Sequence, residues 1–201
     1  MGAEARQNGR YPADVRWTGK LQTLLGDRYD IIEEGLGSRT TDLDYSRKPG
    51  RNGKTYLVPC LGSHTPLDIV VLMLGTNDLK IEYSRSADDI ARAISGLVGD
   101  VRQYTQDSAG NVPKIVLVSP ILIDEQAPRF YEFYTGYYDE KATHESHKLA
   151  AAILEVAEQQ GCEFIDAASV AKPGEDGLHL SEESQAPLAE LLKNTIQSTG
   201  I

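Results

Sequence analysis

The clearest pattern in the chain is an unbroken apolar run from Ile69 to Leu74, short and rich in branched side chains. Such a run is typical of a strand buried on both faces in the middle of a parallel sheet. It stops at Gly75, and the polar residues Thr76, Asn77 and Asp78 follow at once. Ligands of open α/β sheets bind beyond the carboxyl ends of the strands, so this loop is expected to face a site. The alternative is an ordinary βα loop, with Asn and Asp present for turn chemistry.

Strand-like and helix-like patterns alternate along the rest of the chain. Further strands are expected at 29–34, 114–118 and 163–165, with helices at 15–25, 87–106, 139–160 and from Ser181 onward. Pro187 should delay the regular part of the last helix, and a short helix at 56–64 should hold Pro59 in its first turn. Residues 35–55 and 121–138 are expected to be loops. This alternation predicts an α/β fold with a parallel sheet, built as a single domain over residues 1–201.

Composition narrows the choice of partners. The chain has 201 residues and a formal net charge of −10, which argues against nucleic acid and anionic membranes as partners. The polar N-terminus has no apolar segment typical of a signal peptide, so a cytoplasmic protein is expected. Cys60 and Cys162 are the two cysteines, and neither belongs to a C-x-x-C pattern. We expect a reduced pair and no structural zinc.

Two loops carry candidate catalytic groups. In Asp176-Gly177-Leu178-His179, an acid three residues before a histidine can place its carboxylate against the imidazole, as a general base in acyl transfer requires. A surface loop with an incidental histidine is the alternative. Ser38 lies in a glycine-rich turn after the segment 29–34, where a backbone N–H can point at an oxyanion. A plain glycine-rich turn is equally compatible with that pattern.

The remaining aromatic and histidine residues are less specific. The six aromatic residues between Phe130 and Tyr138 could line an acyl or aryl pocket, or could pack against a neighbouring subunit. His144 and His147 are expected on a solvated helix face rather than at a metal. His64, which precedes Thr65-Pro66, is expected in a loop.

Taken together, these motifs resemble the SGNH (GDSL) hydrolases, and most closely their arylesterase and perhydrolase branch. The resemblance covers nearly the whole chain. It rests on Arg10-Tyr11-Pro12, Asp14-Val15-Arg16-Trp17-Thr18-Gly19, Glu33-Glu34-Gly35-Leu36, Arg39-Thr40-Thr41, Pro66-Leu67-Asp68, Met73-Leu74-Gly75-Thr76-Asn77-Asp78 and Asp176-Gly177-Leu178-His179.

The resemblance implies a flavodoxin-like three-layer α/β/α fold that hydrolyses small acyl or aryl esters without metal or cofactor. By the same resemblance His179 is the base and Asp176 its orienting acid. Asn77 and the Ser38 backbone N–H are the oxyanion donors, and Gly75, Thr76, Asp78 and Arg39 belong to the site loops. In this branch the acyl group can also pass to peroxide or an alcohol, and the proteins form closed oligomers, so a homo-oligomer is expected.

The chain departs from the family at one place. The first strand of the family ends in Gly-Asp-Ser, whose serine is the nucleophile, and no such motif occurs in this sequence. The matched region is expected to begin after that strand, which leaves the nucleophile unknown and a gap between the segments 29–34 and 69–74. Ser38 and Ser63 are poor substitutes, because a nucleophile needs its base in reach and an oxyanion hole across the carbonyl. The alternative function is a catalytically silent binding protein that keeps the pocket.

Overall fold

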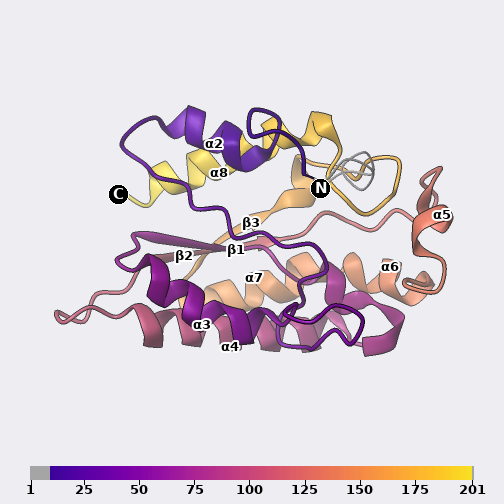
Figure 1. Cartoon of the computed structure of the whole chain (residues 1–201), viewed down its shortest axis with the longest axis horizontal. Helices are drawn as coiled ribbons and strands as arrows, with labels where there is room; N and C mark the ends of the chain where they lie inside the picture. The colour runs from indigo at the N-terminus through magenta and orange to yellow at the C-terminus, as the bar shows by residue number, and fades with distance from the viewer. Residues whose placement is uncertain (1–9, 201) are drawn as a thin grey trace.

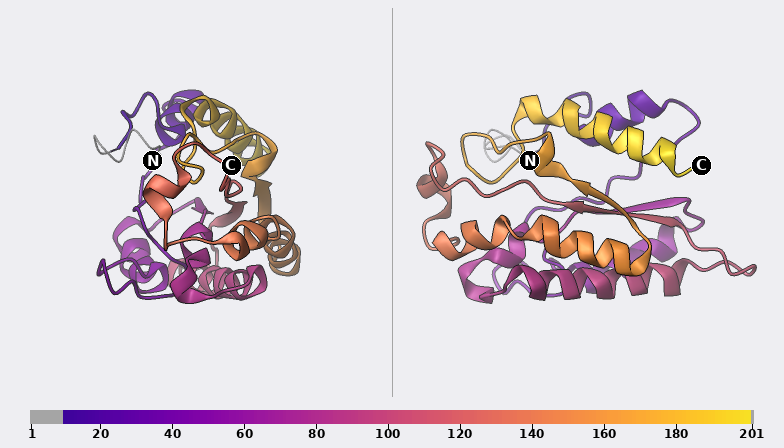
Figure 2. Two further views of the ribbon diagram at one scale, coloured as in Figure 1. Left: turned by 90° about the vertical axis from the view of Figure 1, so that its right-hand side faces the viewer. Right: turned by 180° about the vertical axis from the view of Figure 1, so that it is seen from behind.

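The computed structural model describes residues 10–200, and its helices lie in two layers on either side of a sheet (Figure 1). The view from behind shows the same layers (Figure 2). One layer consists of α2 (Trp17–Leu25) and α8 (Glu182–Ser198), and the other of α3 (Gly53–His64), α4 (Ala87–Thr105) and α7 (Leu149–Gln160). The predicted three-layer α/β/α architecture is therefore confirmed. The polar residues 1–9, on which the expectation about a signal peptide rests, lie outside the described residues.

The sheet has three parallel strands in the described chain, in the order β1 (Ile69–Leu72), β2 (Lys114–Ser119), β3 (Glu163–Asp166). Side chains of β2 alternate between the two cores, since Ile115 and Leu117 pack on one face and Val116 and Val118 on the other. This strand is buried on both faces, as expected in a sheet covered by helices. β1 is only half-buried along its whole length, which corrects the prediction of full burial.

The strand predicted at 29–34 does not form, because these residues make no backbone ladder with a neighbouring strand. Side chains hold the segment instead. The amide of Gln22, on α2, donates to the carbonyl of Tyr29 at 2.8 Å, and its oxygen accepts from the N–H of Ile31 at 2.8 Å. One edge of β1 is thus left without a strand partner among the described residues. The expected gap between 29–34 and β1 stays open.

Several helix boundaries differ from the sequence prediction. α3 begins at Gly53, where Asn52 caps it, so Pro59 lies in the helix interior and His64 is its last residue rather than a loop residue. The predicted 139–160 helix is broken into α6 (Glu140–Ser146) and α7 around His147. The aromatic loop contains a short helix, α5 (Phe130–Tyr134). α8 starts directly after its cap and runs through Pro187, because burial of its apolar face outweighs the one missing backbone bond.

Helices α2 and α4 agree closely with the sequence patterns. Ser86 and Asp89 form a reciprocal capping box at the start of α4, and the apolar face of that helix is buried against the sheet and α7. Gly161 ends α7 in the left-handed conformation, as its position in the sequence predicts. Within residues 10–200, no helix combines the length and the apolar character that crossing a membrane requires.

Candidate active site

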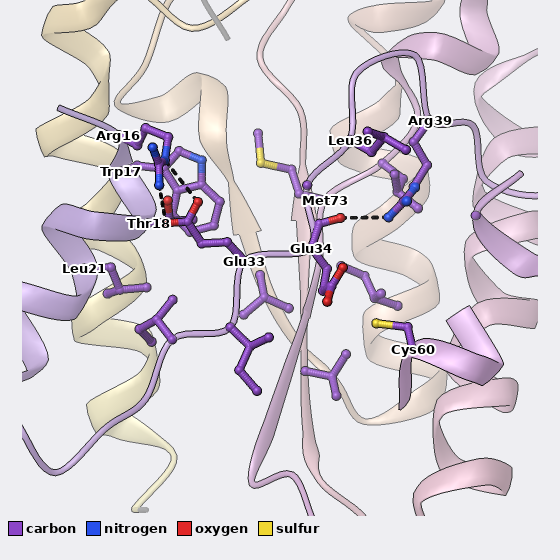
Figure 3. A pocket seen from close by; sticks show the side chains of 18 of the residues that line it. Arg16, Trp17, Thr18, Leu21, Glu33, Glu34, Leu36, Arg39, Cys60 and Met73 are labelled. Atoms are coloured by element: carbon purple, nitrogen blue, oxygen red, sulfur yellow. Dashed lines mark hydrogen bonds and ion pairs between the residues drawn. The ribbon is translucent and has the colours of Figure 1, made fainter. Parts of the chain in front are cut away.

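A large cavity lies where the expected gap separates the segment 29–34 from β1. Its volume is about 1020 Å³, and its walls come from residues 28–39, from β1 with the following loop, from α3 and from the loop that carries His179. Figure 3 shows the Arg16–Glu33 pair on one side of the cavity, and Arg39 and Cys60 beside Glu34 on the other. Large apolar side chains such as Ile32 and Leu36 remain exposed here, because no strand covers them.

Asp176 and His179 meet at the cavity in the predicted way. Nδ1 of His179 lies 2.7 Å from Oδ2 of Asp176, whose side chain is fully buried. The other carboxylate oxygen accepts the backbone N–H groups of Leu178 and His179, both at 3.0 Å. Burial opposes ionisation of this carboxyl, but the hydrogen bonds and the charge of His179 outweigh burial and lower the pKa of Asp176 to about 2. Asp176 is therefore a carboxylate that fixes the orientation of the ring.

Glycine is required inside this loop. Gly177 has a φ of +70°, and a Cβ placed on it would lie 2.0 Å from the backbone oxygen of Asp124. The N–H of Asp124 in turn donates to the carbonyl of Gly177 at 2.9 Å. The loop therefore packs directly on the segment that follows β2, and any side chain at this position would push Asp176 out of line.

Tyr134, on α5, contacts the Asp176–His179 pair, which the sequence did not indicate. Its hydroxyl donates to Oδ2 of Asp176 at 3.0 Å and lies 3.1 Å from Nδ1 of His179. The ring is buried in the core beside Phe130 and Tyr138. These buried rings do not line the cavity, so the suggested aromatic acyl pocket is wrong for them. They pack in the core next to the Asp176–His179 pair instead.

The loop after β1 places Asn77 at the cavity. Gly75, with a φ of +127°, turns the chain out of the strand, and Gly75, Thr76 and Asn77 all line the cavity. The hydroxyl of Tyr138 lies 3.5 Å from Oδ1 of Asn77 and donates to it. That contact directs the carbonyl side of the amide toward Tyr138, which leaves the amide NH₂ as the group available to a ligand oxygen.

Asp78 lies behind the cavity rather than in its wall. It is fully buried, and it accepts hydrogen bonds from the backbone N–H of Thr41 at 3.0 Å and from the Thr41 hydroxyl at 2.5 Å. Arg85 Nη1 lies 3.3 Å from the same carboxylate. Burial raises the pKa of Asp78 to about 6 against these bonds. Asp78 thus ties the Asn77 loop to the turn that carries Ser38.

Ser38 has a φ of +66°, in the left-handed region that few non-glycine residues adopt. It lies in the turn closed by the hydrogen bond from Arg39 N–H to the carbonyl of Leu36, and both Ser38 and Arg39 line the cavity. No described residue accepts a hydrogen bond from the Ser38 backbone N–H. A strained turn with a backbone donor at a cavity is the arrangement expected of an oxyanion site.

Ser38 is the one serine among the described residues that line the cavity. Ser63 is exposed, and its hydroxyl donates to the carbonyl of Pro59 within α3, away from the cavity. His144 and His147 are exposed on and after α6, as predicted for solvated side chains. The described cavity therefore brings together the residues predicted as base, acid and oxyanion donors, and Ser38 is the single serine among its described lining residues.

Glu34 belongs to the 29–34 segment, and its side chain faces α3. Its Oε1 lies 2.8 Å from Nε2 of His64, and its Oε2 accepts a short hydrogen bond from the Tyr56 hydroxyl. These two bonds lower the pKa of Glu34, and the bond to Glu34 raises the pKa of Tyr56 to about 12. Burial raises the pKa of the neighbouring Cys60 thiol. The cluster was not recognised from the sequence, because Glu34 lies 26 residues before Cys60 and 30 residues before His64.

Comparison with known proteins gives a consistent picture. The model of the GDSL-like lipase/acylhydrolase family matches residues 4–186. An acetylxylan esterase of Xylanibacter ruminicola is 27% identical over 98% of this chain, which spans only 40% of that protein's length. A carbohydrate acetylesterase structure from Sinorhizobium meliloti is 36% identical with a TM-score of 0.86, covering 94% of this chain and 88% of its own. The M. smegmatis aryl esterase structure is 37% identical with a TM-score of 0.84, covering 94% and 87%.

Proposed function

Because this chain belongs to the GDSL-like lipase/acylhydrolase family, we propose that it builds the base, acid and oxyanion parts of a serine-type ester hydrolase. The observation that carries this proposal is the 2.7 Å contact between His179 Nδ1 and the buried Asp176. His179 lies at the same cavity as Asn77 and Ser38, so one bound ester could meet all three. This set of groups matches the requirements of acyl transfer.

The proposed reaction proceeds through an acyl-enzyme. A serine hydroxyl attacks the ester carbonyl while Nε2 of His179 takes its proton, and Asp176 stabilises the imidazolium. The Asn77 amide and the Ser38 N–H donate to the oxygen that becomes negative. The tetrahedral intermediate then expels the alcohol, which receives the proton from His179. Water repeats the same steps on the acyl-enzyme and releases the acid.

We place the substrate among esters with small acyl or aryl groups. The relatives named above include an acetylxylan esterase, a carbohydrate acetylesterase and an aryl esterase, which share the ester bond but not the alcohol. His179, Asn77 and Ser38 line the end of the cavity beyond the carboxyl end of β1, where an ester can bind while the extra strand proposed below fills the gap between residues 29–34 and β1. An alcohol or peroxide held there would compete with water for the acyl group.

The attacking serine, in this proposal, is carried by an extra strand in the gap between residues 29–34 and β1. Parallel strands bring their carboxyl ends to the same edge of a sheet. A strand paired in parallel with β1 would therefore end level with Gly75, beside Asn77 and near His179. Ser38 cannot fill this role as well, because its backbone N–H is the proposed oxyanion donor. A silent binding protein that keeps the cavity is the alternative function.

The test compares p-nitrophenyl acetate turnover of the chain as it stands with that of a variant carrying an added N-terminal apolar strand ending in Gly-Asp-Ser. The chain alone should give at most a residual enhancement over water, on the order of 10³–10⁴ in a serine protease that lacks its triad. The added strand should raise turnover by orders of magnitude, and replacing its serine with alanine should abolish the gain. Equal and high rates for all three proteins would refute the proposal. If the added Gly-Asp-Ser strand fills the cavity but the variant shows no turnover, the silent binding protein is favoured.

A further inference from the structure

A second cluster of reactive side chains lies on the α3 side of the cavity. Glu34 comes from the segment without a ladder partner, and Cys60 and His64 lie four residues apart on one face of α3. One carboxylate oxygen, the Cys60 sulfur and one His64 ring nitrogen all lie within 4.8 Å of one another. Figure 3 shows Cys60 beside Glu34 at the cavity wall. The ester chemistry proposed above uses none of these three residues.

The donor set of this cluster matches zinc. Sulfur, imidazole nitrogen and carboxylate oxygen bind zinc at about 2.0–2.3 Å, so the donors of a tetrahedral site lie roughly 3.3–3.7 Å apart. The His64 Nε2 to Glu34 Oε1 distance of 2.8 Å would open slightly, and the sulfur would move inward from its present place. Side-chain rotation alone can supply shifts of this size. A thiolate and a carboxylate together also balance the charge of the ion.

The surroundings support ordered ligands. The Tyr56 hydroxyl holds the second oxygen of Glu34, which fixes the carboxylate in the way that outer partners orient metal ligands. All three candidate ligands are half-buried and line the cavity, so a fourth position would face its interior. The positive charge of the nearby Arg39 side chain would repel a bound cation. The Arg39 guanidinium stacks on the Tyr56 ring at 4.0 Å and donates to the Glu34 carbonyl at 2.7 Å.

We propose that Glu34, Cys60 and His64 form a zinc site that clamps the 29–36 segment to α3. A site with three protein ligands leaves one position open for water or for an oxygen of a molecule in the cavity. Zinc binding would join the otherwise unpaired cavity wall to a helix of the main core, so it would stiffen the cavity without entering the His179 chemistry.

The test is zinc and cobalt titration of the chelator-treated protein. We expect one equivalent of zinc by calorimetry, and a thiolate-to-cobalt charge-transfer band in the near ultraviolet when cobalt replaces zinc. Cys60→Ser should abolish the band and weaken zinc binding by roughly 100-fold or more, since even outer partners of metal ligands are worth about 10–100-fold. Cys162→Ser is the matched control, because Cys162 is also half-buried but lies beside Arg102, outside the cavity. That variant should bind as the wild type does.

Two further measurements keep the proposal open to refutation if Cys60→Ser misfolds. In the wild type, zinc should protect Cys60 but not Cys162 from iodoacetamide, as read by mass spectrometry of the digested protein. Arg39→Gln should tighten zinc binding, because it removes the nearby positive charge. Absence of stoichiometric binding, equal alkylation of Cys60 with and without zinc, or an unchanged cobalt band in folded Cys60→Ser would each overturn the proposal.

Discussion

The hydroxyl of Tyr134 donates to Oδ2 of Asp176 at 3.0 Å, and that same oxygen lies 2.7 Å from Nδ1 of His179. A short helix within the aromatic segment thus supports the acid of the proposed site from below. The two carboxylate oxygens bind different groups. Oδ1 accepts hydrogen bonds from the backbone of its own loop, and Oδ2 contacts the tyrosine and the histidine. Tyr134 therefore helps to hold the carboxylate that contacts His179.

Tyr134→Phe tests this support. Removing a hydrogen bond to a buried carboxylate should lower the free energy of unfolding by about 1–3 kcal/mol, while the ring keeps its packing. Urea unfolding at pH 7 gives the measurement. Tyr131→Phe is the matched control, because Tyr131 lies on the same helix with 64% of its surface exposed. Equal stability of the two variants would contradict the predicted contribution of the Tyr134–Asp176 hydrogen bond.

The low pKa of Asp176 predicts a specific pH dependence. The folded-state pKa of about 2 lies below the ordinary value of 3.8, so the unfolded chain takes up the proton first as pH falls. Asp176 should contribute about 2 kcal/mol to stability above pH 4, and this contribution should fade between about pH 4 and pH 2. Asp176→Asn should therefore lose this acid-dependent part of its unfolding free energy. Asp14→Asn, at an exposed carboxylate, should follow the wild-type curve. Parallel curves for Asp176→Asn and the wild type would be inconsistent with the shift.

Gly177→Ala should disrupt the site through the backbone. A Cβ at this position meets the Asp124 oxygen at 2.0 Å and the Phe130 ring at 2.9 Å, and the φ of +70° is strained for alanine. We expect a loss of stability of about 1–3 kcal/mol or more and a displaced His179 ring signal in NMR. Gly99→Ala provides the opposite control. Gly99 is exposed within α4 with open space around it, so alanine there should stabilise by up to about 1 kcal/mol.

Gln22→Leu should release the 29–34 segment. The Gln22 side chain replaces the absent ladder by bonding both Tyr29 and Ile31, so its loss leaves the Ile31 N–H without its acceptor. Hydrogen exchange at Ile31 should accelerate, whereas amides of β2 should exchange as before. Gln159→Leu is the control, because that exposed side chain bonds Glu155 on its own helix. Unchanged exchange at Ile31 would mean that other contacts hold the segment.

The sequence predicted the layers, the three parallel strands and the Asp176–His179 contact, because these depend on local apolar patterns and on a loop of four residues. The sequence-based prediction was wrong where the structure depends on contacts between residues far apart in the chain. The segment 29–34 has a strand-like composition, but a strand exists only through its ladder, and no described strand pairs with it. The prediction that β1 is fully buried is wrong for the same reason, since the edge of β1 faces the cavity.

Several contacts at the proposed site also depend on tertiary structure, which the sequence pattern does not indicate. Nothing in the neighbourhood of Tyr134 in the sequence indicates that its hydroxyl reaches Asp176, which is 42 residues away. The sequence placed Asp78 at the site by its position in Gly75-Thr76-Asn77-Asp78, whereas the structure buries it against Thr41. The prediction that proline limits two helices is wrong, since Pro59 and Pro187 both lie inside helices. In α8 a buried apolar face outweighs the one missing bond.

The most direct test of the proposed site is covalent labelling with an organophosphonate that reacts with activated serines, read by intact mass and by peptide mapping. We predict that the chain as it stands takes up no stoichiometric label at Ser38 or Ser63. With the added strand ending in Gly-Asp-Ser, one equivalent should appear on the serine of that strand, and His179→Asn should abolish the labelling. Stoichiometric labelling of Ser38 in the chain alone would contradict the assignment of that residue as an oxyanion donor and would show that the attacking serine is already present.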